Sequence, residues 1–179
     1  MPVSEPVEIR RLDALDARAS LDDLAAVLAD CVAGGASVNY MAPFSHDAAR
    51  SAFEGFITDV EQGRRLLVAA FLDGAVVGSV QVVLALPPNQ PHRGEIAKLL
   101  VSRAARNRGI AQSLMERAEA EARAAGKTLL VLDTVTGGDA ERLYTRLGWT
   151  PVGVVPGFAL FPDGQLCATT YFYKEIAAV

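Results

Sequence analysis

A short basic turn, Arg106-Asn107-Arg108-Gly109, carries the residue types in this chain that are best suited to holding an anion. A helical pattern begins directly after it, and the first turn of a helix presents backbone N–H groups without intrahelical partners. The helix dipole and two arginines add positive charge, and a glycine lets an anion approach the backbone closely. The turn is therefore typical of a phosphate site, and pyrophosphate fits it. The competing interpretation is a tight strand-to-helix turn whose arginines are only solvated.

The hydrophobic pattern predicts the elements that position this turn. Residues 95–111 begin with an apolar, β-branched run that is typical of a strand. Apolar residues then recur every fourth position from Ile110 to Ala122, opposite a charged face, which predicts a helix that ends at Gly126. A second apolar strand, Lys127 to Asp133, follows this helix. Because crossovers of this kind are right-handed and join parallel strands, we expect the two strands to run parallel.

The rest of the chain alternates strand and helix patterns. Asp73-Gly74 joins two β-branched runs and is a strong hairpin signal. The predicted order is β-α-α-β-β-β-α-β-α-β-β, which is an α/β fold, or α+β under a stricter definition. The remaining predicted strands are Val7–Leu12, Arg65–Leu72, Ala75–Leu86, Val152–Val155 and Cys167–Lys174, and the remaining helices are Leu21–Val32, Ser45–Gln62 with Ser45 as N-cap, and Asp139–Leu147.

Composition limits the function classes. The 179 residues and 51% apolar content suit one domain with a real core, and a net charge of −4 argues against a nucleic-acid or anionic-membrane binder. Cys31 and Cys167 lie far apart without a Cys-x-x-Cys pattern or a signal peptide, which favours reduced thiols in a cytoplasmic protein. Only His46 and His92 are available as imidazole ligands, so we expect no metal site.

Two segments resemble one family. Residues 106–111 fit the Arg/Gln-x-x-Gly-x-Gly/Ala motif of the GNAT (Gcn5-related N-acetyltransferase) superfamily, after a strand and at the start of a helix as that family requires. Residues 140–149 resemble its Ala-x-x-x-Tyr-x-x-x-Gly-Phe/Tyr segment, and the element order matches over essentially the whole chain. The resemblance implies a single GNAT domain over residues 1–179, with a mostly antiparallel sheet of about seven strands, one central parallel βαβ crossover and about four flanking helices.

Within the superfamily the chain is similar to the tabtoxin-resistance acetyltransferase. The stretches that carry this narrower similarity are residues 34–38, 132–134, 156–158, 162–164 and 170–172. The chain departs from the wider pattern at Gly137, where many members have an Asn that contacts coenzyme A.

The family resemblance implies acetyl-CoA as the donor and a primary amine as the acceptor. In GNAT folds the strand before the motif splays from its parallel neighbour, and its unpaired backbone groups take up the pantetheine amides. The positions that match this strand are Leu99, Leu100 and Val101. The pyrophosphate falls to the motif itself, which is Arg106, Asn107, Arg108, Gly109, Ile110 and Ala111.

A dinucleotide-binding fold is the rival interpretation, because a strand, a glycine, a helix and then Asp133 imitate part of its fingerprint. That fingerprint requires Gly-x-Gly-x-x-Gly, and Ala111 and Leu114 follow Gly109 instead. Too little chain remains after it to complete a doubly wound sheet.

The resemblance also implies the catalytic residues. Glu95 stands eleven residues before Arg106, at the position of the catalytic glutamate in the histone-acetylating branch, and Asp133 ends the neighbouring strand. An equivalent pair of carboxylates is proposed for the tabtoxin-resistance enzyme, where it would hold a cationic amine and accept its proton. Tyr144 occupies the general-acid position, next to the departing sulfur of coenzyme A. A strand-end carboxylate, a helix cap and a packing tyrosine are the alternative roles of the three.

The acceptor is expected to lie against residues 34–43, which separate two helices and carry Asn39, Tyr40 and Met41. The preferred function is acetylation of a small-molecule amine such as an amino acid, an amino-acid-like toxin or an antibiotic, by direct transfer in a ternary complex. Acetylation of a protein lysine or N-terminus is the second possibility, and a non-catalytic acyl-CoA-binding regulatory domain is the third. Whether the protein forms a homodimer stays open.

Overall fold

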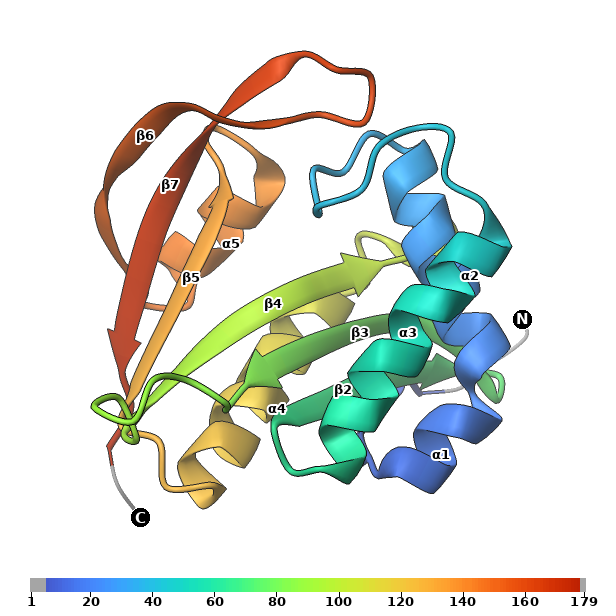
Figure 1. The fold of residues 1–179 in the computed structure, drawn as a ribbon, viewed down its shortest axis with the longest axis horizontal. Helices are drawn as coiled ribbons and strands as arrows, with labels where there is room; N and C mark the ends of the chain where they lie inside the picture. Colours follow the sequence, from blue (N-terminus) through green and yellow to red (C-terminus); the bar gives the residue numbers. More distant parts are fainter. Residues whose placement is uncertain (1–5, 178–179) are drawn as a thin grey trace.

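A computed structural model describes residues 6–177 of the chain. Its strands and helices form a mixed α/β fold built on one seven-stranded sheet (Figure 1). The strands are β1 (Glu8–Leu12), β2 (Arg65–Leu72), β3 (Ala75–Val83), β4 (Arg93–Val101), β5 (Leu129–Val135), β6 (Thr150–Leu160) and β7 (Leu166–Glu175). The helices are α1 (Ala14–Ala19), α2 (Leu21–Ala33), α3 (His46–Glu61), α4 (Ile110–Ala124) and α5 (Asp139–Arg146), with a 3-10 turn at Arg103–Ala105.

The sheet has the strand order β1-β2-β3-β4-β5-β7-β6, and every neighbouring pair is antiparallel except β4 with β5. That parallel pair, predicted from the crossover through α4, is short. Its register covers three residues on each strand and ends where Glu95 lies opposite Val131. Beyond this point β4 and β5 diverge and form a V in the middle of the sheet (Figure 1).

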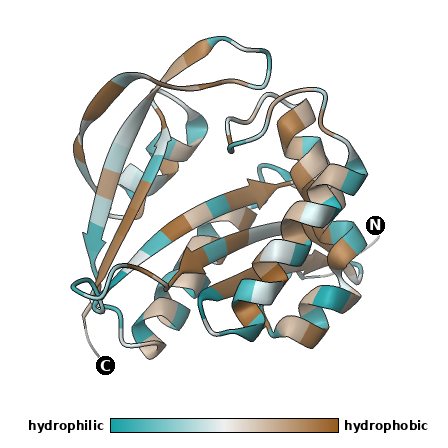
Figure 2. Ribbon diagram, in the orientation of Figure 1, coloured by the Kyte–Doolittle hydropathy of each residue, from teal (hydrophilic) through white to brown (hydrophobic). Residues whose placement is uncertain are grey.

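Helices cover both faces of the first half of the sheet. Helix α4 packs against β2, β3 and β4, while α2 and α3 pack on the opposite side of the same strands. One buried cluster therefore centres on Leu114 and Met115 of α4, and a second on Leu28 and Phe53 of α2 and α3. The six central residues of β2 are buried, and the brown central strands of Figure 2 show this apolar character. No helix in residues 6–177 has the length and apolarity needed to cross a membrane.

The structure differs from the predicted elements in several places. Helix α1 was not expected, because six residues are too few for a helical period. The side chain of Asp13 caps it by accepting a 2.8 Å hydrogen bond from the backbone N–H of Asp16. Strand β3 ends at Val83 instead of Leu86, and strand β5 continues to Val135 instead of ending at Asp133.

Strand β6 differs most, since it spans Thr150–Leu160 instead of Val152–Val155. Pro151, Pro156 and Gly157 within it are residues that usually end a strand. The strand lies at the edge of the sheet, where proline needs no hydrogen-bond partner on its outer side, and its pairing with β7 is interrupted between Val155 and Ala159.

Candidate active site

The divergence of β4 and β5 opens two adjoining cavities. The larger has a volume of about 510 Å³ and the smaller about 270 Å³. They share four lining residues, which are Ala36, Leu99, Asp139 and Ala140. The two cavities are therefore consecutive parts of one cleft, which starts where the parallel pairing of the strands ends.

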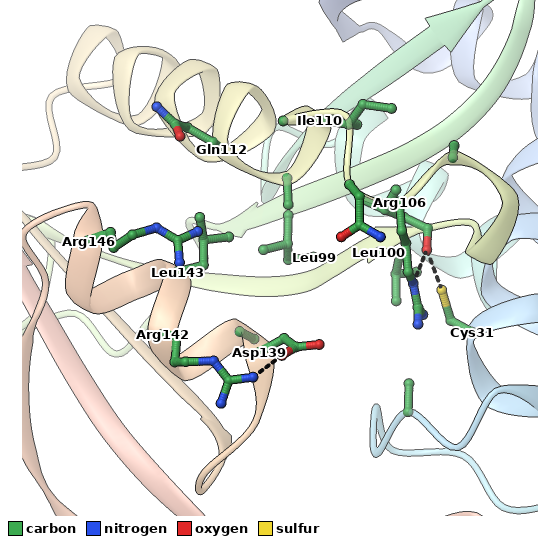
Figure 3. A pocket seen from close by; sticks show the side chains of 17 residues that line it. Cys31, Leu99, Leu100, Arg106, Ile110, Gln112, Asp139, Arg142, Leu143 and Arg146 are labelled. Atoms are coloured by element: carbon green, nitrogen blue, oxygen red, sulfur yellow. Dashed lines mark hydrogen bonds and ion pairs between the residues drawn. The ribbon is translucent and has the colours of Figure 1, made fainter.

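The larger cavity, which we call the donor cavity, lies between the C-terminal half of β4, the basic turn and α5 (Figure 3). Most of the predicted cofactor-binding residues line it, namely Leu99, Leu100, Val101, Arg106, Asn107, Gly109, Ile110 and Ala111. Arg108 and Tyr144, which belonged to the same predicted set, are not among its lining residues. Arg108 is exposed, and Tyr144 lines the smaller cavity.

The turn presents free backbone donors to the donor cavity. The first hydrogen bond of α4 runs from the N–H of Ser113 to the carbonyl of Gly109 at 3.1 Å, so the N–H groups of residues 110–112 have no intrahelical partner. The backbone conformation at position 109 favours glycine, because the φ of Gly109 is +76° and lies in the left-handed region. Arg106 folds back so that its Nε donates to the carbonyl of Val101 at 3.3 Å. These donors and this charge fit a pyrophosphate.

Two arginines that the sequence reasoning did not single out form the opposite wall. Arg142 and Arg146 extend from α5 into the donor cavity, across from the basic turn (Figure 3). Arg142 forms an ion pair with Asp139. The two arginines are four residues apart, so they lie on one side of α5. This spacing is the feature of the sequence from which their shared position could have been predicted. The cavity thus offers positive charge from both walls, as a ligand with several phosphates needs.

The smaller cavity, which we call the acceptor cavity, is lined by segments from six parts of the chain. Asp133 reaches it from β5, Thr169 from β7, Phe158 from β6 and Tyr144 from α5. The α2–α3 loop and β4 complete it with Ala36, Ser37, Val38, Asn39, Ile96, Ala97, Lys98 and Leu99.

The α2–α3 loop is hydrogen-bonded to the β6–β7 hairpin beside the acceptor cavity. Ser37 Oγ donates to the carbonyl of Leu160 at 2.8 Å, and the N–H of Ala42 donates to the carbonyl of Pro162 at 3.0 Å. The two segments accordingly lie side by side at the top of Figure 1. Of the predicted acceptor residues in this loop, Asn39 lines the cavity, whereas Tyr40 stacks on Phe44 with ring centroids 4.5 Å apart.

Of the other predicted acceptor and catalytic residues, some line the acceptor cavity and others do not. Met41 is 45% exposed and does not line the cavity. Asp133 lines it, and Oδ2 of Asp133 accepts a 2.7 Å hydrogen bond from the hydroxyl of Thr169. Glu95 lies at the last parallel pair, outside the lining residues, where it accepts a 2.7 Å hydrogen bond from Nη1 of Arg93.

Tyr144 is buried beside the acceptor cavity. Its ring centroid lies 6.0 Å from those of Trp149 and Phe172. Burial raises the pKa of Tyr144 well above the ordinary value of a phenol, and the negative charge of Asp133 raises it further. The phenol therefore keeps its proton at neutral pH and can act as a hydrogen-bond donor inside the cleft.

Lys98 lines the acceptor cavity and was not expected there. It sits at a bulge in β4, where the register with β3 shifts between Ser79 and Gln81, and its φ is +51°. Such a backbone costs a non-glycine residue about 1–3 kcal/mol and turns its side chain out of the regular alternation. Burial lowers the pKa of Lys98 to about 8, helped by the positive charge of Arg65 and opposed by Asp133. Nothing in the local sequence marks this bulge.

Comparison with known protein families gives a clear match. The model of the acetyltransferase (GNAT) family matches residues 29–149. A protein of Azospirillum brasilense, described as an uncharacterized N-acetyltransferase encoded in the hisH-hisA intergenic region, is 32% identical over 129 residues, which are 71% of this chain and 74% of that protein.

Solved structures share the fold. An N-acetyltransferase from Staphylococcus aureus Mu50 superimposes with a TM-score of 0.78 at 21% identity, over 96% of this chain and 99% of that one. A phosphinothricin acetyltransferase from Sinorhizobium meliloti in complex with acetyl-CoA gives 0.77 at 18% identity, over 97% and 90%. A Salmonella typhimurium structure that contains acetyl-CoA as its cofactor gives 0.78 at 19% identity, over 97% and 95%.

Proposed function

Because the chain belongs to the acetyltransferase (GNAT) family, we propose that this acetyl-CoA-dependent N-acetyltransferase acts on the primary amine of a small molecule. The observation that carries the proposal is the pair of adjoining cavities. One is basic and rich in free N–H donors, and the other contains a carboxylate and a protonated phenol. A donor with phosphates and an acceptor with an amine match these two chemistries.

The donor cavity suits acetyl-CoA, which family members of known structure bind. In this proposal the N–H groups at the start of α4 and the side chains of Arg106, Arg142 and Arg146 hold its phosphates. The open edge of β4 at Leu99 and Val101 takes the pantetheine amides, since β5 no longer pairs with this part of the strand. Bound acetyl-CoA supplies the reactive thioester.

Removal of a proton from the amine falls to a carboxylate. An alkylammonium has a pKa of about 10, so it must be deprotonated before it can attack the thioester. Asp133 is the better placed base, because it lines the acceptor cavity while Thr169 fixes one of its oxygens. Glu95, held by Arg93 outside that lining, can accept the proton only through water or after a change of rotamer.

Tyr144 interacts with the departing sulfur of coenzyme A in this proposal. A thiol has a pKa of about 8.5 and this phenol a much higher one, so complete proton transfer from Tyr144 to the thiolate would be unfavourable. A hydrogen bond from the phenol to the developing thiolate stabilises the same charge without that cost. We assign this role to Tyr144.

A small acceptor fits the size of the acceptor cavity better than a protein segment does. Its volume of about 270 Å³ lies below the roughly 300–1,000 Å³ of sites for drug-sized ligands, and the contacts of Ser37 and Ala42 with the β6–β7 hairpin close one side of it. We therefore propose an amino acid, an amino-acid-like toxin or an antibiotic as the acceptor. The narrower resemblance to the tabtoxin-resistance acetyltransferase is part of the same proposal. The free thiols of Cys31 and Cys167 support a cytoplasmic location as part of this proposal.

The proposal is tested with a panel of amines. Purified protein and acetyl-CoA are mixed with amino acids, aminoglycosides, polyamines, lysine-containing peptides and peptides with free N-termini, and free thiol release is recorded. We expect amine-dependent release with at least one small amine and N-acetyl product of matching mass. Release only with peptides would favour the protein-acetylating alternative, and tight acetyl-CoA binding without any release would favour a regulatory acyl-CoA-binding domain.

A further inference from the structure

Resting on the proposed function, we infer that Lys98 is the counter-ion for an acidic group of the acceptor, so that the preferred acceptor carries a carboxylate or a similar anion as well as its amine. The inference starts from the position of Lys98 in the wall of the acceptor cavity, which also contains Asp133. A cavity with one fixed negative and one fixed positive side chain is complementary to a zwitterion.

The charge on Lys98 is not neutralised within the protein. No acidic side chain in residues 6–177 lies within 4.0 Å of Nζ, and the neighbour that the ammonium faces is the ring of Tyr40, whose centroid is 5.7 Å away. The other two lysines of the chain differ: Lys174 forms an ion pair with Glu119, and Nζ of Lys127 donates to the carbonyl of Pro91. Lys98 is therefore available to a ligand, although it is half-buried.

Asp133 and Lys98 also do not form an ion pair with each other. No contact of 4.0 Å or less joins their charged groups, although the negative charge of Asp133 acts on Lys98. A purely cationic acceptor that approached Asp133 would be repelled by the ammonium of Lys98. An acceptor with an acidic group removes this repulsion, because each end then meets an opposite charge.

The backbone of Lys98 supports a role for its side chain. A left-handed φ favours glycine, yet a lysine occupies the bulge of β4 and turns toward the cavity and the Tyr40 ring. A cation–π contact with Tyr40 stabilises the ammonium while no ligand is bound, and a strong anionic partner can replace or supplement it.

The experiment compares matched acceptors that differ only in charge. The probes are three pairs of an amino acid and its carboxamide, with increasing separation between the amine and the acid: methionine, 4-aminobutyrate and 6-aminohexanoate. The kcat/KM of each is measured for the wild-type protein, for Lys98→Met, for Lys98→Arg and for Arg123→Met, a matched loss of charge in the last turn of α4. The ratio between wild type and variant cancels the difference in amine pKa within a pair.

We expect the preference for the acid over its carboxamide to fall about tenfold to a hundredfold in Lys98→Met for at least one pair, which is the usual worth of a charge-assisted hydrogen bond. Lys98→Arg should keep most of the preference and Arg123→Met all of it. Acetyl-CoA binding by each variant reports correct folding. An equal preference in wild type and Lys98→Met would overturn the inference.

Two further measurements separate this inference from the proposed function. Calorimetry with the three acids and CoA-loaded protein measures binding without turnover. Acid binding that is weakened by Lys98→Met supports the role of Lys98 even if no amine is acetylated, and the proposed function alone would then fail. Absence of acid-selective binding overturns the inference. Intact-mass analysis after incubation with acetyl-CoA alone should find Lys98 unmodified, because acetylation of Nζ would make it an internal acceptor and not a counter-ion.

Discussion

The hydroxyl of Thr169 donates a 2.7 Å hydrogen bond to Oδ2 of Asp133, and so ties the end of β5 to β7 at the wall of the acceptor cavity. The same hydroxyl also contacts the carbonyl of Thr134 at 2.9 Å. One oxygen of the carboxylate is thereby fixed, and the other stays available for the ammonium of an acceptor. In the proposed mechanism this relationship favours Asp133 over Glu95 as the base that removes the proton.

Asp133→Asn should therefore lower kcat/KM by roughly a hundredfold or more, which is the usual contribution of a general base. Glu95→Gln should cost less, since Glu95 is engaged with Arg93 and lies outside the cavity lining. Steady-state kinetics at a fixed acetyl-CoA concentration measure both. A double variant with wild-type kcat/KM across pH would show that neither carboxylate is the base.

Tyr144→Phe should lower kcat while leaving acetyl-CoA affinity within about twofold, because in the proposed mechanism the phenol acts on the departing sulfur, and it lies outside the lining of the donor cavity. The loss of one such donor costs on the order of 10²–10³ in kcat. Since burial raises the pKa of Tyr144, its ionisation should not limit the wild-type rate below about pH 10. An alkaline fall near pH 8 that disappears in Tyr144→Phe would contradict this assignment.

Gly109→Glu should abolish acetyl-CoA binding in calorimetry, because it puts a negative charge at the end of α4 that we propose holds the phosphates. Gly126→Glu is the matched control at the other end of the same helix. Both glycines have a positive φ, at +76° and +78°, and a Cβ at either would meet open space. The strain is thus similar and only the position differs, so Gly126→Glu should retain binding. Equal loss in both variants would mean that strain, not charge, explains the effect.

Arg146→Ala should weaken acetyl-CoA binding by roughly fivefold to tenfold, with an effect that shrinks at high salt, because a partly exposed charge pair is worth about 1 kcal/mol. Acetyl-pantetheine lacks the phosphates, so the apparent affinity for it should not change. Arg123→Ala, near the C-terminal end of α4, serves as the control. A similar loss of affinity for acetyl-CoA and for acetyl-pantetheine would mean that Arg146 stabilises the fold of α5 and does not bind the phosphates.

The KM for an acid-bearing acceptor should rise above about pH 8. Lys98 is cationic below its pKa of about 8 and neutral above it, so its attraction for an anion is present at low pH and lost as the pH rises. The charged side chains of Arg65 and Asp133 act on Lys98, and burial raises the pKa of Tyr40 further from this range. The carboxamide of the same acceptor should lack this rise, and Lys98→Arg should move it to higher pH. An equal rise of KM for the acid and for its carboxamide would mean that a group other than Lys98 causes the pH dependence.

Much of this site could be predicted from the sequence because it depends on local patterns. The helical period after Gly109 and the apolar run before Arg106 predict a strand, a turn and a helix, and the structure contains β4 and α4 in these places. The parallel pairing of β4 with β5 was also predicted correctly, because the crossover rule needs only their order.

What the sequence did not predict depends on pairing between distant segments. The bulge at Lys98 exists because β3 and β4 lose register there, and no residue near Lys98 signals it. The different surroundings of Asp133 and Glu95 follow from the exact residue at which β4 and β5 separate. The length of β6 depends on its place at the sheet edge, where prolines are tolerated.

The most direct measurement is a crystal structure of the protein with coenzyme A and an amine bound. We expect the pyrophosphate on the N–H groups of residues 110–112, the pantetheine along Leu99 to Val101, and the sulfur within about 3.5 Å of the Tyr144 hydroxyl, with the amine between the sulfur and Asp133. Coenzyme A seated elsewhere, or a sulfur that does not reach the acceptor cavity, would contradict the account that the two cavities are the donor and acceptor halves of one acetyltransferase site.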